Sequence, residues 1–156
     1  MKITRTMLVT AALCFTAAAA AFAANPHLGT WKLNESKSKL SPGIGHKDTV
    51  TYTETGAGRI ELTADGVDKD GKQTHWTWEG KFDGKPYKVE GATTVDTIAY
   101  KMMNDHTNSM SGMKDGKTMM TGTITVAKDG KSRVVTTTMT DEKGKKTTNK
   151  SYFDKQ

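Results

Sequence analysis

The chain has 156 residues, which suits one domain of ordinary size, and only 35% of them are hydrophobic. Its 23 basic and 17 acidic residues give a formal net charge of +6, but the lysines alternate with aspartate, glutamate and glycine. Nucleic-acid binding needs a clustered basic face with interleaved aromatic residues, so this charge pattern argues against a nucleic-acid partner.

Residues 1–23 have the three-part layout of a secretory signal. Lys2 and Arg5 precede an apolar run that is short for a membrane span, and Ala21 and Ala23 provide the small residues of a cleavage site. We therefore expect an exported protein, periplasmic or secreted, with no stable membrane insertion after cleavage. Removing residues 1–23 leaves 21 basic and 17 acidic residues, a net charge of +4.

The single cysteine, Cys14, lies inside this apolar run. Leu13 precedes it where a lipid-attachment signal needs a small residue, so we do not expect a lipoprotein. The mature chain then has no cysteine, and the one domain predicted for residues 24–156 has to be held by packing and strand pairing alone.

Apolar and β-branched residues alternate with period two over most of residues 24–156, and no stretch shows a convincing helical period. Val50 and Tyr52, for example, share one face of a run in which threonines occupy the other. The alternation predicts ten strands, near residues 29–34, 47–54, 59–67, 72–82, 85–90, 95–103, 107–113, 117–127, 131–140 and 145–154. Residues 35–46 break the pattern and predict an irregular loop, which either crosses a barrel mouth or runs along the surface.

The tetrapeptide Lys-Asp-Gly-Lys occurs at residues 69–72, 114–117 and 128–131, with a near copy, Phe-Asp-Gly-Lys, at 82–85. Each lies between two alternating runs, and Asp-Gly suits the positive φ angles of tight hairpin turns. Connections this short make sequential strands antiparallel neighbours. Closure would remove the two exposed edges of such a meander. We therefore predict an all-β fold, an antiparallel meander that closes into a lipocalin-like barrel of about eight to ten strands.

The first predicted strand begins with Gly29, Thr30 and Trp31, and this Gly-x-Trp resembles the opening of lipocalin and calycin barrels. The resemblance implies that the tryptophan plugs the closed end and that a cation from a late strand packs over its ring. An indole is large enough for such a plug, and a cation over its face adds attraction. Arg133 is the candidate cation and Lys150 the alternate; the competing interpretation is an ordinary core tryptophan.

A wider resemblance covers nearly the whole mature chain. The stretches GTWKLNESKSKL at residues 29–40 and SYFDKQ at 151–156 are similar to those of small exported bacterial proteins described as lipocalin-like, of the calycin type. This resemblance implies a barrel fold and a signal peptide, and it implies no particular chemistry.

Trp76 and Trp78 lie on one face of a predicted strand. If that face points into the barrel, the two indoles beside Tyr52, Tyr100 and Met102 make an aromatic, apolar wall for a ligand. The alternative is that these five side chains only fill the core. No oligomeric state follows from the pattern.

A segment rich in methionine follows, and it contains Met103, His106, Met110 and Met113. Thioether and imidazole groups are ligands that soft metals such as Cu(I) accept, so copper or silver binding is an alternative function. Methionine is also a flexible core filler, and alternation would divide these side chains between two faces of a strand.

No pattern of a nucleophile with a nearby base is present in the sequence, so we expect no enzyme, no catalytic residues and no cofactor. The function that we expect is non-catalytic: the barrel holds a small lipophilic ligand, apolar or amphipathic. The alternatives are soft-metal binding and a structural or interaction module with a filled core.

Overall fold

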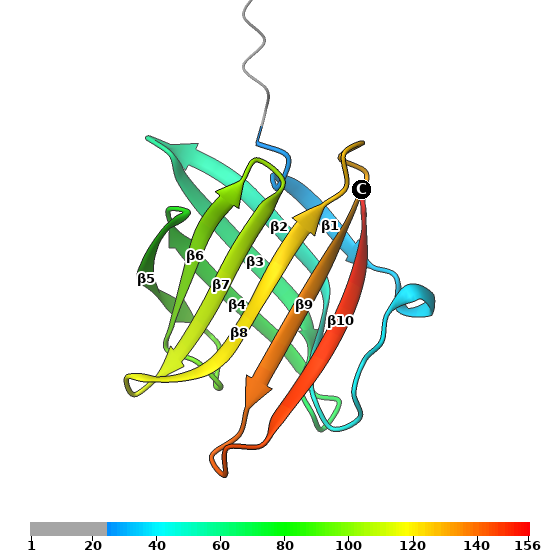
Figure 1. Cartoon of the computed structure of the whole chain (residues 1–156), viewed down its shortest axis with the longest axis vertical. Coiled ribbons are helices and arrows are strands. Elements are labelled where there is room, and N and C mark those ends of the chain that lie inside the picture. The colour runs from blue at the N-terminus through cyan, green and yellow to red at the C-terminus, as the bar shows by residue number, and fades with distance from the viewer. Residues whose placement is uncertain (1–24) are drawn as a thin grey trace, which may run out of the picture.

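The computed structural model describes residues 25–156; the predicted signal peptide and Cys14 lie outside the described residues. Figure 1 shows one barrel with almost no helix. Its elements are β1 (Gly29–Leu33), η1 (Glu35–Lys37), β2 (His46–Gly56), β3 (Arg59–Val67), β4 (Gln73–Gly80), β5 (Asp83–Glu90), β6 (Thr97–Asn104), β7 (Thr107–Lys114), β8 (Lys117–Val126), β9 (Ser132–Thr140) and β10 (Lys146–Lys155). Between residues 25 and 156, no helix has the length and apolar character needed to cross a membrane.

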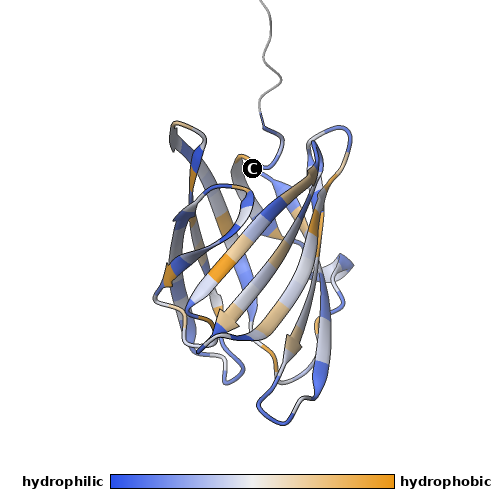
Figure 2. Cartoon of the chain, turned by 60° about the vertical axis from the view of Figure 1, so that its left-hand side comes forward, coloured by the Kyte–Doolittle hydropathy of each residue, from blue (hydrophilic) through white to orange (hydrophobic). Residues whose placement is uncertain are grey.

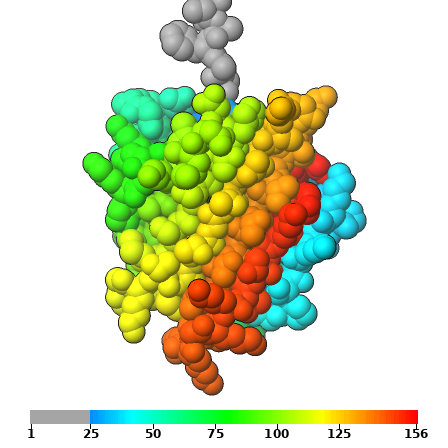
Figure 3. Space-filling model, in the orientation of Figure 1, coloured from blue at the N-terminus to red at the C-terminus, as the bar shows by residue number. Residues whose placement is uncertain are grey.

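Every strand pairs antiparallel with the next, and β1 pairs with β10, so the meander closes. The predicted fold class is thereby confirmed, with ten strands, the upper limit of the expected number. The predicted strand boundaries differ from the observed ones by at most two residues. Figure 3 shows the front wall as a continuous surface of neighbouring strands without an exposed edge.

The turn motifs behave as predicted at three of their four positions. Between β7 and β8, Asp115 and Gly116 have φ angles of 48° and 76°, which is the geometry expected of a tight hairpin. The fourth motif differs, because Asp83 and Gly84 already belong to β5 and the connection from β4 is Lys81 and Phe82. The ladder between β5 and β6 is irregular between Asp83 and Pro86, where proline cannot donate a ladder hydrogen bond.

The barrel has two ends, which we name after a residue of each. The Trp31 end, at the top of Figure 1, holds the start of β1, the end of β10 and the β2–β3, β4–β5, β6–β7 and β8–β9 connections. The Met139 end, at the bottom, holds the β3–β4, β5–β6, β7–β8 and β9–β10 connections. Figure 2 shows hydrophobic and hydrophilic positions alternating along the walls and hydrophilic hairpins at the Met139 end.

Inward-facing side chains fill the two ends differently. Trp31, Trp78 and Arg133 are all buried at 2% exposure or less, and they occupy the Trp31 end. Met120 and Met139, which pair across β8 and β9 near the other end, stay half-buried. The largest fully buried side chains are therefore toward the Trp31 end, although Val95 and Ile98, in and just after the β5–β6 connection, are buried too.

The irregular segment after β1 forms part of the wall. Lys39 forms an isolated bridge with Lys150 on β10, and the backbone N–H of Ser41 donates to Oδ1 of the buried Asn149 at 2.6 Å. In Figure 3 this segment lies beside β10. Of the two alternatives for residues 35–46, the structure thus favours a surface path beside β10 over a lid across a mouth.

Candidate functional site

Trp31, the predicted plug, is buried near one end of the barrel. Its ring is fully buried, and its indole nitrogen donates a hydrogen bond to the carbonyl oxygen of His27 at 2.9 Å. The guanidinium carbon of Arg133 lies 4.7 Å from the ring centroid, and Nζ of Lys155 lies 5.1 Å from it. Lys150, the alternate cation, lies instead 5.4 Å from the Tyr152 ring. Gly29, two residues before Trp31, has a φ of 106°, which favours glycine.

Arg133 is a buried cation surrounded by aromatic rings. Its guanidinium carbon also lies 4.9 Å from the ring centroids of Tyr52 and Phe153. Within residues 25–156 it forms no salt bridge, and its Nε and Nη1 atoms are buried without a hydrogen-bond partner. Burial lowers the pKa of Arg133, while the nearby Tyr52 and Tyr100 hydroxyls oppose that change. Attraction to three ring faces is its main observed compensation.

An aromatic cluster adjoins Arg133. The Phe82 ring centroid lies 6.4 Å from that of Tyr52, 6.3 Å from that of Trp78 and 5.9 Å from that of Tyr100. Trp78 and Tyr100 meet edge to face at 4.8 Å, and the Trp78 indole donates to the carbonyl of Ile98 at 2.9 Å. The structure therefore brings three of the five predicted lining residues together, all of them buried. The sequence analysis missed Phe82, which links them.

Met102, the fourth predicted lining residue, is 45% exposed. It borders a hollow of about 330 Å³ at the Trp31 end, together with Ile60 and the half-buried Phe82. The rim of the hollow is polar and is formed by Asn25, Glu54, Gly58, Lys81 and Asp83. This volume is at the lower limit of small-molecule sites, and its apolar residues lead directly to the aromatic cluster.

Trp76, the fifth predicted lining residue, lies outside the aromatic cluster. It is half-buried toward the Met139 end, where Nζ of Lys47 lies 5.5 Å from its ring centroid. Burial lowers the pKa of Lys47. Trp76 and Trp78 share a face, but two residues of a strand span about 7 Å, so one face does not place both at the same end. The predicted wall is therefore divided between the two ends.

Several buried polar side chains at the Trp31 end have no partner. Within residues 25–156, both ring nitrogens of His27 and both amide atoms of Asn108 are buried without a hydrogen bond, as is Nδ1 of His106. Burial, followed by the positive charges of Arg133, His106 and Lys155, lowers the pKa of His27 to about 4. Buried polar atoms are normally hydrogen-bonded, so a group of them without partners points to a role beyond packing.

The methionine-rich segment does not form one cage. Met103 is 60% exposed, whereas Met110 is 8% exposed and belongs to the core, so these two side chains are on opposite faces. Met113 is half-buried beside a register shift after Gly112, and His106 lies in the β6–β7 connection. The four residues proposed for a soft metal are thus divided between the interior and the surface.

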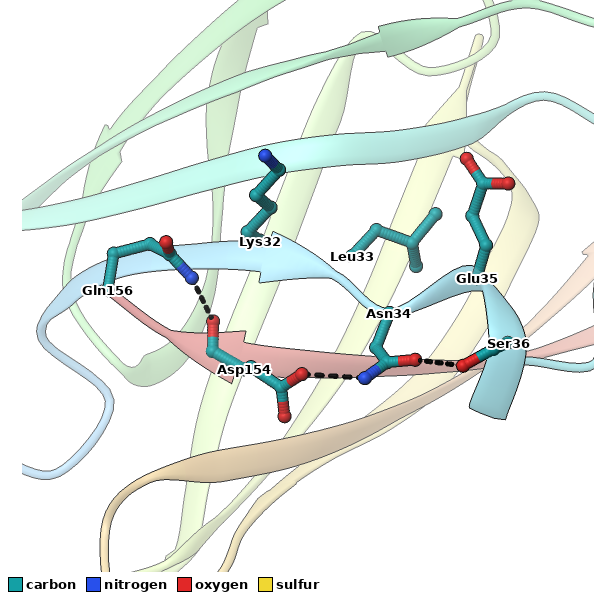
Figure 4. Close-up of a pocket in the computed structure, with 7 residues that line it drawn as sticks. All are labelled: Lys32, Leu33, Asn34, Glu35, Ser36, Asp154 and Gln156. Carbon is teal, nitrogen blue, oxygen red and sulfur yellow. Dashed lines mark hydrogen bonds between the residues drawn. The ribbon is translucent and has the colours of Figure 1, made fainter.

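Two further surface features were not apparent in the sequence. Glu35, His46 and Asp48 hold their side-chain ligand atoms within 4.8 Å of one another, with 3.1 Å between His46 Nε2 and Asp48 Oδ1. A polar hollow of about 370 Å³ lies beside them, on the outer surface of β1, η1 and β10 (Figure 4). There Asn34 donates to Asp154 at 2.7 Å and accepts from Ser36 at 2.8 Å, so these groups satisfy one another and tie the first turn to the last strand.

No protein-family model matches the chain, and no curated protein sequence is significantly similar to it. Two solved structures with a similar shape are EF1p2_mFAP2b bound to DFHBI and mFAP1, a redesigned beta barrel, bound to DFHBI. The first is 10% identical, with a TM-score of 0.48, and the match covers 86% of this chain and 97% of that one. The second is 12% identical, with a TM-score of 0.43, covering 84% and 95%. Neither likeness bears on what this chain binds.

Proposed function

We propose that this protein is a non-catalytic, exported binding protein that holds a small apolar or amphipathic molecule at the Trp31 end of its barrel. The observation that carries the proposal is the hollow beside Phe82, where Met102 and Ile60 offer apolar surface at the mouth. A 45% exposed methionine at the edge of a buried aromatic cluster is apolar surface that a ligand would cover. Export rests on the signal expected in residues 1–23.

Phe82 is placed to open the way from this hollow to the aromatic cluster. It lies in the short connection between β4 and β5, which pair only through Thr77 with Glu90 and Trp78 with Val89. Figure 1 shows β5 at the left-hand edge of the barrel. A hairpin with so few ladder hydrogen bonds opens at lower cost than its neighbours. The backbone carbonyl of Phe82 accepts a hydrogen bond from the Met102 N–H at 3.1 Å, so a rotation of the Phe82 side chain is the movement that would admit a ligand to Trp78 and Tyr100.

The proposal is tested with the uncharged fluorescent probe N-phenyl-1-naphthylamine. We expect saturable binding, seen as probe emission excited by energy transfer from tryptophan. Met102→Gln, which places an amide where a thioether lined the hollow, should weaken binding roughly tenfold through the lost apolar contact. Met103→Gln is the matched control, because Met103 is adjacent in sequence and 60% exposed, and it should leave binding unchanged.

Trp76→Phe tests the location independently. Trp76 lies toward the Met139 end, so this variant should bind the probe as the parent protein does. No saturable binding in the parent protein would leave the filled structural module as the better account. If Trp76→Phe lost probe binding and Met102→Gln kept it, the ligand would bind toward the Met139 end, which would contradict the proposal.

The rival soft-metal function is tested by adding Cu(I) under reducing conditions. Because Met103 and Met110 face opposite sides of the wall, we expect no tight stoichiometric binding, and no effect of replacing Met110 and Met113 together with leucine. Tight binding that this double variant abolishes would favour the metal instead.

A further inference from the structure

The group of unpartnered polar atoms bears on the kind of ligand that the Trp31 end accepts. Arg133 is the central member, a cation at 2% exposure that no described carboxylate pairs with. Burying a charge without an opposite charge is costly, and removing a hydrogen-bond partner from a buried group costs more than replacing the pair with apolar groups. If the side chain at position 133 only filled space beside Trp31, an uncharged side chain would do so at a lower desolvation cost.

Asn108 and His27 extend this arrangement. Asn108 lies on the inward face of β7 at 0% exposure, and its register partner Met102 is the residue that borders the hollow. His27 lies over the same end, with its ring centroid 6.0 Å from that of Phe82. Phe82 therefore lines the hollow and also contacts the Tyr52 ring, over which Arg133 lies at 4.9 Å.

The electrostatic environment beneath Phe82 is positive. Arg133 contributes a full charge, and Nζ of Lys155 lies 5.1 Å from the Trp31 ring centroid. Burial, followed by the charges of Arg133 and Lys155 among others, lowers the pKa of His27. The carboxylates at this end, Glu54 and Asp83, are exposed and lie at the rim of the hollow. With Lys81 as the one cation among the lining residues of the hollow, the rim is net negative, so an anion would be favoured below the rim over the rim itself.

We propose that the ligand carries an anionic group, a carboxylate or a sulfonate, that binds beneath Phe82 to Arg133 and Asn108, while its apolar body occupies the hollow. The inference rests on the function proposed above and specifies the chemical class of ligand. Arg133 supplies the charge and two N–H donors, at Nε and Nη1, and the Asn108 amide supplies a further donor. Phe82 has to move for the anionic group to pass, and the sparsely paired β4–β5 hairpin permits this.

Two fluorescent probes that share a ring system and differ in charge test this inference separately from the proposed function. N-phenyl-1-naphthylamine is uncharged, and 8-anilino-1-naphthalenesulfonate adds one sulfonate to the same ring system. Arg133→Met removes the charge at similar side-chain length. We expect it to weaken binding of the sulfonate probe by roughly ten- to a hundredfold, the range for a lost charge-assisted hydrogen bond, and to leave the uncharged probe within about twofold.

Asn108→Leu is the second variant, because it replaces an unpartnered amide with an apolar group of similar size and is therefore expected to fold. It should weaken the sulfonate probe by roughly five- to tenfold and spare the uncharged one. Far-ultraviolet circular dichroism and thermal unfolding verify that each variant folds. Lys81→Met tests the rim instead: it removes a cation that borders the same hollow, and we expect it to change sulfonate binding less than Arg133→Met does. Lys128→Met is the matched control, because it removes an exposed cation from the β8–β9 connection outside the hollow, and both probes should bind it as they bind the parent protein.

The outcomes are distinct. If neither probe binds the parent protein, the proposed function itself fails. If the uncharged probe binds, but Arg133→Met and Asn108→Leu change both probes equally, the site is apolar only and the anion inference is wrong. A large loss of sulfonate binding in Lys81→Met with none in Arg133→Met would place the anion at the rim and would also overturn the inference.

Discussion

The two ends of this barrel are built from the same strands but differ in what their inward faces carry. At the Trp31 end the inward side chains are large, and Trp31, Trp78 and Arg133 are buried almost completely. At the Met139 end, Met120 and Met139 remain half-buried. The comparison shows that closure of the sheet by strand pairing does not by itself determine how completely side chains fill the interior. Pairing closes the wall, most sparsely between β4 and β5, whereas the most deeply buried aromatic side chains lie toward one end.

The largest expected difference between the ends concerns their tryptophans. Trp31→Ala should lower the free energy of unfolding by about 3–5 kcal/mol, because it empties a fully buried position and uncovers Arg133. Trp76→Ala should cost about 1–2 kcal/mol, because Trp76 is half-buried and loses less apolar contact. Denaturant unfolding of both variants measures the difference. Equal losses would contradict the description of one dense end and one loose end.

The pH dependence of the unfolding free energy tests the burial of His27 at the Trp31 end. His27 has a pKa lowered to about 4, so the folded protein binds fewer protons than the unfolded chain between pH 4 and about 6.5. The contribution of His27 is complete above pH 6.5 and is lost as the pH falls through 4, a change of about 3 kcal/mol. His27→Gln should therefore show a shallower pH dependence of unfolding free energy over this window. Trp76→Phe, which removes no titratable group, is the control and should follow the pH dependence of the parent protein.

Substitutions at two glycines should produce smaller losses of stability that depend on local packing. A Cβ at Gly112 would meet only side-chain atoms, Val95 Cγ1 at 2.8 Å and Met120 Cε at 3.0 Å. A Cβ at Gly122 would lie 2.3 Å from the backbone oxygen of Thr136, which cannot move without shifting β9. Gly112→Ala should therefore cost less than about 1 kcal/mol and Gly122→Ala about 1–3 kcal/mol. Thermal unfolding of the two variants gives the order, and the reverse order would show that the interior near Gly112 is the more tightly packed.

Much of the fold could be predicted because local signals agree with one another. Alternation in threonine-rich runs gives the strand faces, and Asp-Gly pairs mark the turns. The exception is residues 82–85, where the same tetrapeptide opens a strand. Pro86 and a register irregularity lie nearby, and a turn motif alone does not reveal how the two strands will pair.

The candidate site could be predicted only in part. Alternation identifies which side chains point inward, and so it found Tyr52, Trp78 and Tyr100. It does not indicate their depth along the barrel, and Trp76 was therefore grouped with residues at the other end. Phe82 lies in a connection, where periodicity carries no signal. Asn108 was also missed, because an unpartnered buried amide is recognisable only once its surroundings are known.

The methionines give the most direct test of where the ligand binds, because they occur at both ends. The protein with methionine methyl groups labelled with carbon-13 is titrated with N-phenyl-1-naphthylamine and followed by nuclear magnetic resonance. Our account predicts that the methyl signal of Met102 shifts in proportion to the bound fraction while those of Met120 and Met139 stay in place. Shifts at Met120 and Met139 with an unchanged Met102 signal would show that the ligand enters the opposite end, and would contradict the central claim.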